Sequence, residues 1–218
     1  MSENSNTDRN FVIRNHKIIE LTPKGEKQEK LVTPSSVTEI GDAAFYCGRR
    51  LKEIVISEGI TKIGLEAFCD CKYLQKITIP ETVTYIGEGA FRCTSIDKVV
   101  IPRSVSEMGD GVFVGCESLK EVSFRNEAGY IPAYTFASCT NLERFVIPDG
   151  VTKIGDEAFC GCISLKEVII PKTVKWIGDG AFWGCMSLKE VVIADHTLFG
   201  YDAFDDECRV LRYEDFIY

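Results

Sequence analysis

"IGDEAFCGCISLKEVII" at residues 154–170 returns as "IGDGAFWGCMSLKEVVI" at residues 177–193, and this near copy decides the fold. The phenylalanine of each copy marks a register that continues along most of the chain, at Phe45, Phe68, Phe91, Phe113, Phe136, Phe159, Phe182 and Phe204. Successive marks lie 22 or 23 residues apart. Self-similarity at such a period is the signature of stacked supersecondary units. The sequence therefore predicts one elongated repeat solenoid.

Residues 142–165 serve as the type of the repeat. They run Leu142-x-x-Phe145-x-Ile147-Pro148, then Val151-x-x-Ile154-Gly155, then Ala158-Phe159-x-x-Cys162, and then the next Leu165. The segment Leu-x-x-Val-x-Ile alternates with a period of two, which predicts a short strand with its fourth and sixth side chains in the core. Seven such strands are predicted to begin at Leu51, Leu74, Ile96, Leu119, Leu142, Leu165 and Leu188, with a weaker eighth around Val210 to Tyr213.

The rest of each repeat returns the chain to the next strand. The proline after the strand lacks a ladder donor and should end the pairing. The glycine of each Ile-Gly pair is expected at a positive φ. The Ala-Phe pair should turn its ring inward, so that stacked repeats form an aromatic spine. In "IPAYTF" (131–136), Pro132 stands where glycine is expected, which predicts a locally different outer turn.

The domain boundaries follow from where the period starts and fades. We expect a disordered polar tail at 1–10, an N-terminal cap hairpin at 11–32, seven repeats at 33–193, and a degenerate repeat with an acidic C-terminal cap at 194–218. The acidic residues of this last segment are Asp195, Asp202, Asp205, Asp206, Glu207, Glu214 and Asp215. Terminal repeats must cover an apolar face that no neighbour covers, so a polar cap is expected there.

Charge and hydropathy restrict the classes of partner. The net charge is −8 with a pI of about 5.0, and no basic stripe is present, so nucleic acid and anionic membranes are not expected partners. The start is polar, and no stretch reaches 18 consecutive apolar residues, so neither a signal peptide nor membrane insertion is expected. A cytoplasmic location is the plain expectation. The alternative is a cell-surface or secreted protein whose export signal is absent from this sequence.

The pattern Leu-x-x-Val-x-Ile-Pro-x-x-Val-x-x-Ile-Gly-x-x-Ala-Phe-x-x-Cys resembles the BspA-like, or Treponema-type, leucine-rich repeat. The resemblance covers residues 33–193 clearly and 194–213 weakly. It implies a right-handed solenoid with a concave parallel β-sheet and an irregular or 3₁₀ convex side. It also implies a bacterial or protozoan protein, of a family often found at cell surfaces that binds proteins or matrix. The family shares no catalytic residues that could be carried over to this chain.

The ten cysteines do not form a metal-ligand pattern. Half of them lie three residues after a marker phenylalanine, as one inward column: Cys71, Cys116, Cys139, Cys162 and Cys185. We expect these to be small buried hydrophobes. Cys160 is the best candidate for an exposed reactive thiol. Because His16 and His196 fall in opposite caps, no Cys-His or Ser-His pair is expected. The sequence therefore predicts no metal, no cofactor and no enzyme, with a thiol-dependent enzyme as the remaining catalytic alternative.

The outward positions of the predicted strands carry the candidate binding site. The third residue of each Leu-x-x-Val-x-Ile segment is charged: Glu53, Lys76, Lys98, Glu121, Arg144, Glu167 and Glu190. Opposite charges on adjacent strands predict the pairs Glu53–Lys76 and Lys98–Glu121–Arg144–Glu167. The fifth place is mostly apolar, with Val55, Thr78, Val100, Ser123, Val146, Ile169 and Val192. An apolar stripe rimmed by charge predicts a protein-binding surface centred on Val146, Ile169 and Val192. A plain solvated ladder on a β-branched sheet is the alternative.

A second column, six residues before each marker phenylalanine, contains aromatic residues in alternate repeats, at Tyr85, Tyr130 and Trp176. We expect these rings to pack partly under the turn, with ligand stacking as the alternative. Taken together, the sequence predicts a module that binds a partner protein without catalysis. The competing interpretation is a structural, adhesin-like or self-associating module that forms homo-oligomers.

Overall fold

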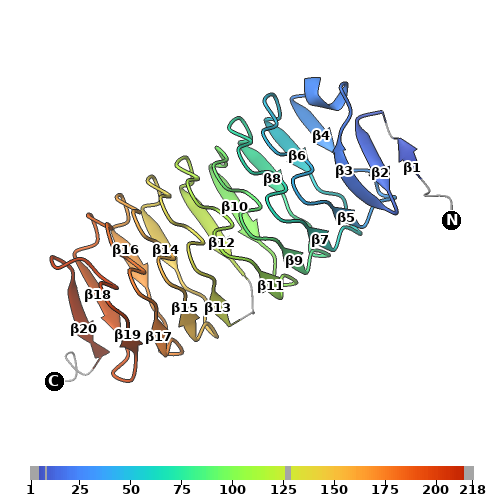
Figure 1. Cartoon of the computed structure of the whole chain (residues 1–218). Helices are drawn as coiled ribbons and strands as arrows, with labels where there is room; N and C mark the ends of the chain where they lie inside the picture. Colours follow the sequence, from blue (N-terminus) through green and yellow to red (C-terminus); the bar gives the residue numbers. More distant parts are fainter. Residues whose placement is uncertain (1–4, 8, 126–128, 214–218) are drawn as a thin grey trace.

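The computed structural model describes residues 5–7, 9–125 and 129–213, and it shows a mainly-β solenoid of about eight turns (Figure 1). Successive turns stack along one axis, and the two ends of the chain lie at opposite ends of the stack. The 3₁₀ turn η1 (Gly25–Lys27) is the single helical element of the described residues. The predicted solenoid is therefore confirmed.

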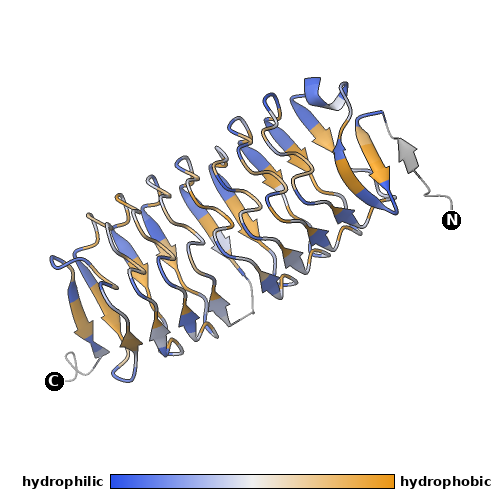
Figure 2. Cartoon of the chain, in the orientation of Figure 1, coloured by the Kyte–Doolittle hydropathy of each residue, from blue (hydrophilic) through white to orange (hydrophobic). Residues whose placement is uncertain are grey.

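One row of parallel strands, each three or four residues long, runs along the solenoid. These strands are β4 (Lys30–Val32), β6 (Glu53–Val55), β8 (Lys76–Thr78), β10 (Lys98–Ile101), β12 (Glu121–Phe124), β14 (Arg144–Val146), β16 (Glu167–Ile169), β18 (Glu190–Ile193) and β20 (Arg209–Arg212). We call their outward side the long-strand face. Figure 2 shows a hydrophilic start and a hydrophobic continuation in most of these strands. The weak eighth strand predicted near Val210 is confirmed as β20, which pairs with β18.

The seven strands from β6 to β18 each begin two residues later than predicted. The reason lies in the leucine that was taken as the first residue of the strand. The Leu165 N–H donates to the Cys162 carbonyl at 3.0 Å, and the Leu188 N–H donates to the Cys185 carbonyl at 2.8 Å. The leucine therefore closes a corner turn, and ladder pairing starts only after it.

A second row of parallel strands, each two residues long, lies on the return side. These strands are β5 (Glu39–Ile40), β7 (Lys62–Ile63), β9 (Tyr85–Ile86), β11 (Glu107–Met108), β13 (Tyr130–Ile131), β15 (Lys153–Ile154), β17 (Trp176–Ile177) and β19 (Leu198–Phe199). We call their outward side the short-strand face. An irregular or 3₁₀ return was expected here, and this sheet was not predicted. In β5 to β17 the second residue is buried and the first is half-buried or exposed.

The N-terminal cap begins with a hairpin of β2 (Phe11–Arg14) and β3 (Lys17–Leu21). Its two-residue turn, Asn15 and His16, has φ values of 48° and 61°, as a tight hairpin turn that matches the strand twist requires. β3 then pairs with β5 in parallel and continues the short-strand sheet. Ser5–Thr7, within the segment expected to be a disordered tail, form β1 against β2. Residues 1–4 and 8 of that tail, and 214–218 of the C-terminal cap, lie outside the described residues.

The aromatic spine is confirmed along the full repeat array. Neighbouring marker rings from Phe45 to Phe204 have centroids 4.6–5.7 Å apart and interplanar angles of 3–23°. Phe11 of the cap meets the first ring edge-on at 6.1 Å. The rings from Phe45 to Phe182 are at most 2% exposed, so the spine is the centre of one continuous core.

The glycine of each Ile-Gly pair does not take a positive φ, and this prediction was wrong. A Cβ on Gly178 would lie 2.5 Å from the backbone nitrogen of Asp156 in the preceding turn, and a Cβ on Gly64 would lie 2.6 Å from that of Asp42. Glycine is required here because two backbones pass each other too closely for any side chain. Positive φ values of 48–60° occur two residues later, at Ala43, Glu66, Gly89, Gly111, Tyr134, Glu157, Gly180 and Asp202.

Pro132 produces the local difference that was predicted. In a regular turn the residue at this place donates its N–H across to the preceding turn, as Gly155 does to the Ile131 carbonyl at 2.8 Å. Proline has no N–H, and the short-strand sheet is interrupted between β11 and β13. The Tyr130 hydroxyl donates to the Met108 carbonyl at 3.4 Å instead. The Thr135 hydroxyl donates to the Pro132 carbonyl at 2.8 Å and stabilises the altered turn.

Replacing a ring in the middle of the spine should destabilise the whole stack. We expect Phe159→Ala to lower the free energy of unfolding by about 3–5 kcal/mol, since it removes a fully buried ring. Phe199→Ala is the matched control, because Phe199 is 42% exposed and should lose about 1 kcal/mol or less. Urea unfolding followed by circular dichroism measures both. Equal losses would contradict a spine that holds the stack together.

Two glycine variants test the corrected role of the Ile-Gly pair. Gly178→Ala should cost about 2–3 kcal/mol, because its Cβ would collide with the backbone of the preceding turn. Gly89→Ala should cost only about 1 kcal/mol, since Ala43 already occupies the equivalent left-handed position. The same urea experiment decides the order of the two losses. A larger loss for Gly89→Ala than for Gly178→Ala would contradict the close backbone approach as the reason for glycine in the Ile-Gly pair.

Candidate functional site

The predicted apolar stripe lies along the long-strand face in register. Val146 pairs with Ile169 across β14 and β16, and these side chains are 50% and 40% exposed. Val192, expected as the third central residue, is only half-buried, and so is Val55. The predicted centre is therefore best exposed at the β14–β16 pair.

The stripe extends one strand further at each end than the sequence analysis predicted. Val32 of β4 pairs with Val55 and is 63% exposed, and Leu211 of β20 pairs with Val192. "LVTP" at residues 31–34 carries the signal for the first of these, because it repeats the strand-then-proline pattern across the boundary between the predicted cap and the first repeat.

Hydrogen-bonded pairing divides the long-strand face into sections. The paired groups are β4–β6–β8, β10–β12, β14–β16 and β18–β20. Where β8 meets β10, a cavity of about 350 Å³ opens on the surface. Its lining brings together the predicted site residues Thr78, Lys98, Val100 and Ser123. The stripe thus consists of exposed apolar side chains, with a cavity between β8 and β10.

The charged column beside the stripe is largely paired. Lys98 Nζ lies 2.8 Å from Glu121 Oε1, and Arg144 Nε lies 3.0 Å from Glu167 Oε2, as predicted. The predicted link between Glu121 and Arg144 is not among the ion pairs of the described residues, because β12 and β14 belong to different sections of the row. Glu53 pairs with Lys30 of the cap at 2.7 Å and not with Lys76, although Lys76 is its register neighbour. The hydrogen bond from Lys30 lowers the pKa of Glu53, and burial opposes this shift. Solvent screens such exposed pairs, so they set stacking register more than stability.

A second charged column was missed by the sequence analysis. It lies one residue before the first column, or two residues before it at Glu207. Its pairs are Glu29–Lys52 at 3.0 Å, Glu143–Lys166 at 2.9 Å and Lys189–Glu207 at 2.7 Å. Arg209 and Glu190 add a pair of the first column at 3.4 Å. The apolar stripe is therefore bordered on this side by charges that are mostly neutralised within the chain.

The aromatic column lies on the short-strand face, where its rings are partly exposed. Tyr85, Tyr130 and Trp176 are the first, outward residues of β9, β13 and β17. Tyr130 and Trp176 are each 37% exposed. Lys62 Nζ lies 4.8 Å from the centroid of the Tyr85 ring, where a cation is attracted to the ring face. The short-strand sheet thus carries the rings outward because its strands alternate with a period of two.

The cysteine column is buried as predicted and has a hydrogen-bonding role as well. Each thiol donates to the carbonyl of the marker phenylalanine one turn before, for example Cys71 to Phe45 at 2.9 Å and Cys162 to Phe136 at 3.1 Å. Burial raises the pKa of Cys71, Cys116 and Cys162 to about 12. These thiols are protonated at neutral pH and are not nucleophiles.

Cys160 does not have the environment of a reactive thiol. Desolvation raises its pKa first, and the neighbouring Glu157 carboxylate raises it further. A reactive cysteine needs a positive neighbour that lowers its pKa. His16 lies in the β2–β3 turn and His196 between β18 and β19, at opposite ends of the stack (Figure 1). A cysteine–histidine pair is not formed by these residues.

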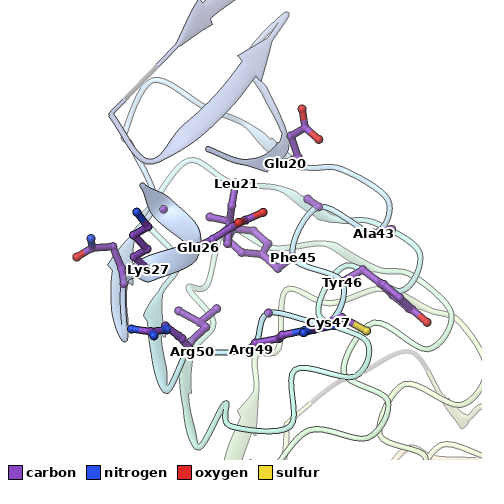
Figure 3. Close-up of a pocket in the computed structure, with 15 residues that line it drawn as sticks. Glu20, Leu21, Glu26, Lys27, Ala43, Phe45, Tyr46, Cys47, Arg49 and Arg50 are labelled. Carbon is purple, nitrogen blue, oxygen red and sulfur yellow. The ribbon is translucent and has the colours of Figure 1, made fainter. Parts of the chain in front are cut away.

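A cavity lies between the N-terminal cap and the first turn. It measures about 660 Å³ (Figure 3). Lys27, Arg49 and Arg50 face it together with Glu20 and Glu26. This mixture of charges favours neither an anion nor a cation, so the lining defines no class of ligand. Within the described ranges, no group of three or more His, Cys, Asp or Glu side chains is arranged to hold a metal ion, and no helix could cross a membrane.

The chain belongs to the family of the BspA type Leucine rich repeat region, whose profile matches residues 24–143 and 129–212 in six copies. A solved leucine-rich repeat protein of T. pallidum is 27% identical, with 97% of this chain and 82% of that chain covered and a TM-score of 0.58. A leucine-rich repeat protein of Bacteroides ovatus is 21% identical, covers 99% and 90%, and has a TM-score of 0.51. A comparison with curated proteins finds no match. The predicted family is thereby confirmed.

The cysteine column should make stability fall in alkaline solution. Below the ordinary thiol pKa of 9.0, folded and unfolded chains hold the same thiol protons. Above it the unfolded chain releases protons that the folded chain keeps, so rising pH favours unfolding. For Cys71, Cys116 and Cys162 together, we expect a loss of about 4 kcal/mol at about one pH unit above that value. Urea unfolding between about pH 8 and pH 10 measures it.

A single variant isolates the contribution of one thiol to this slope. Cys162→Ala should reduce the dependence of unfolding free energy on pH by one proton, or about 1.4 kcal/mol per pH unit. Cys47→Ala is the matched control, because it removes an exposed thiol outside the buried column. Identical slopes for Cys162→Ala and the wild type would contradict a buried, protonated column.

Proposed function

We propose that the chain is a protein-recognition module and that the long-strand face is its binding surface. The observation that carries the proposal is the exposed Val146–Ile169 pair on a hydrogen-bonded sheet. A rigid sheet loses little conformational freedom on binding, and exposed β-branched side chains on it can be covered by a partner at low entropic cost. Membership of a leucine-rich repeat family supports the same class of function.

The geometry of the face supports a partner that presents an apolar ridge. The stripe is one residue wide and is bordered by the pairs Arg144–Glu167 and Lys98–Glu121. The hollow between β8 and β10 can accept one protruding side chain beside Val100. An apolar centre with a polar rim is the usual anatomy of a protein interface. The Arg144 guanidinium at this rim can also donate to a partner.

Partner capture with a stripe variant tests the proposal. Val146→Glu combined with Ile169→Glu should weaken retention of a captured protein by about tenfold or more, because two charges would be buried against it. The matched control is Leu65→Glu with Ile163→Glu, which changes two side chains of 45% and 44% exposure elsewhere. Both control positions tolerate glutamate, since Glu88 and Glu117 occupy them in other turns. Bound proteins are identified by mass spectrometry and their affinities measured by calorimetry.

The outcomes separate recognition from self-association. A protein that wild type and control retain and the stripe variant loses supports the proposal. Equal retention by the wild type, the control and the stripe variant contradicts it. If the retained species is the chain itself, sedimentation at increasing concentration will show a rising mass that the stripe variant abolishes. Val146→Ser with Ile169→Thr, chosen to match Ser123 and Thr78 of the same column, provides a milder change that the strands already accept.

A further inference from the structure

A cleft at the outer corner of the C-terminal turns is lined by aromatic rings. It measures about 430 Å³ and lies apart from both the long-strand face and the aromatic column of the short-strand face. Tyr134, Trp183 and Tyr201 contribute the rings, and they are 42%, 56% and 79% exposed. Three large aromatic side chains exposed around one hollow are more than solubility requires.

The left-handed positions of the turns shape this cleft. Tyr134, Glu157 and Gly180 occupy the same place in successive turns, with φ values of 57°, 51° and 57°. Gly180 forms the floor, because a Cβ there would lie 3.2 Å from Cγ of Glu157 and 3.8 Å from Cβ of Trp183. The missing side chain at this position therefore keeps the space between the acid and the indole ring open.

Four carboxylates line the same cleft, from Asp156, Glu157, Asp179 and Asp202. Asp156 and Asp179 each use one oxygen to accept a backbone N–H of the next turn, at 3.1 and 2.8 Å. Within the described part of the chain, no lysine, arginine or histidine forms an ion pair with any of the four. This contrasts with the paired charge columns of the long-strand face.

The negative potential of the cleft acts on the ring beside it. The Glu157 carboxylate raises the pKa of the Tyr134 hydroxyl, followed by burial and by Asp156 and Asp110. Nearby negative charge disfavours a second anion and favours a cation. The aromatic faces favour a cation as well, because their quadrupole is negative above the ring.

We propose that this cleft binds an arginine-containing basic segment of a partner protein. A guanidinium group is planar, so it can stack on Trp183 or Tyr201 while its N–H groups donate to a carboxylate in a bidentate pair. Asp156 and Asp179 lie on successive turns, about 4.8 Å apart by sheet spacing, so an extended segment along the axis meets carboxylates repeatedly. The site is independent of the function proposed for the long-strand face.

A peptide titration tests the cleft directly. The probe is the capped peptide Gly-Arg-Gly-Arg-Gly-Arg-Gly, and its control is the same peptide with citrulline, a neutral isostere, in place of arginine. In the background Trp176→Phe, Trp183 is the remaining tryptophan of the chain and its fluorescence reports binding. We expect the arginine peptide to change this fluorescence with saturation at low ionic strength. The citrulline peptide should leave it unchanged.

Two variants with equal change of charge locate the site. Glu157→Gln with Asp202→Asn should weaken binding about tenfold, through the loss of two partner charges. Glu58→Gln with Glu81→Gln removes two exposed carboxylates outside the cleft and should change affinity less than about twofold. Gly180→Gln should also weaken binding without changing charge, because it fills the floor. Glu157 shows that this left-handed place accepts a side chain of that size.

Three results of the peptide titration would contradict the proposed arginine site. The proposal fails if the arginine peptide does not perturb Trp183, or if Gly180→Gln binds like the wild type. It also fails if both charge variants weaken binding equally, since the attraction would then belong to the acidic chain as a whole. Val146→Glu with Ile169→Glu should bind the peptide like the wild type, so failure here and failure of the long-strand proposal are distinguishable.

Discussion

Backbone hydrogen bonding between successive turns is the constraint on which the rest of the structure depends. Turns pair with one another within the sections of the long-strand row, within those of the short-strand row, and again along the return. On the return, the Phe45 N–H donates to the Ala67 carbonyl and the Phe68 N–H to the Ala90 carbonyl, each at 2.8 Å. Buried amide groups need such partners, because leaving one unpaired is costly. Three separate lines of pairing fix the distance between turns at the spacing of strands in a sheet.

That fixed distance explains why one residue type recurs in each column. Aromatic rings at this spacing stack face to face, so phenylalanine fills its column from Phe45 to Phe204. Backbones that approach closely at the Ile-Gly corner leave no room for a Cβ, so glycine fills that column. A small donor fits beside the phenylalanine carbonyl, which explains the cysteines. Thr94 takes the same place in its turn, and its hydroxyl lies 3.2 Å from the Cys116 sulfur. Pro132 breaks the pairing, and there the short-strand sheet is interrupted.

The sequence was sufficient to predict the features that this constraint repeats. The period, the family, the strand row, the spine, the buried thiols and two of the ion pairs all follow from columns of like residues. The short-strand sheet was missed because a two-residue strand is too short for periodicity to reveal. The Lys30–Glu53 pair was missed because the cap was treated as a hairpin alone, whereas β4 continues the long-strand row.

The aromatic cleft was missed for a different physical reason. Left-handed backbone is normally inferred from glycine, yet Tyr134 and Glu157 adopt it here without being glycine. Inter-turn pairing imposes the conformation on whichever residue falls at that place, so local propensity gives no signal. A cleft built from such positions becomes visible only when the turns are stacked.

The same constraint separates structural charges from charges that are available to a partner. A side chain that points along the stack meets its counterpart one turn away, so alternating signs neutralise each other, as in Lys98–Glu121 and Arg144–Glu167. Acidic residues at the same place in successive turns cannot neutralise each other in this way. Asp156 and Asp179 stand on successive turns, and one oxygen of each accepts a backbone N–H of the next turn. Repetition that stabilises the backbone therefore also accumulates unpaired negative charge at the corner. The proposed arginine segment would bring the opposite charge to this corner, whereas the long-strand face offers a partner mainly apolar surface.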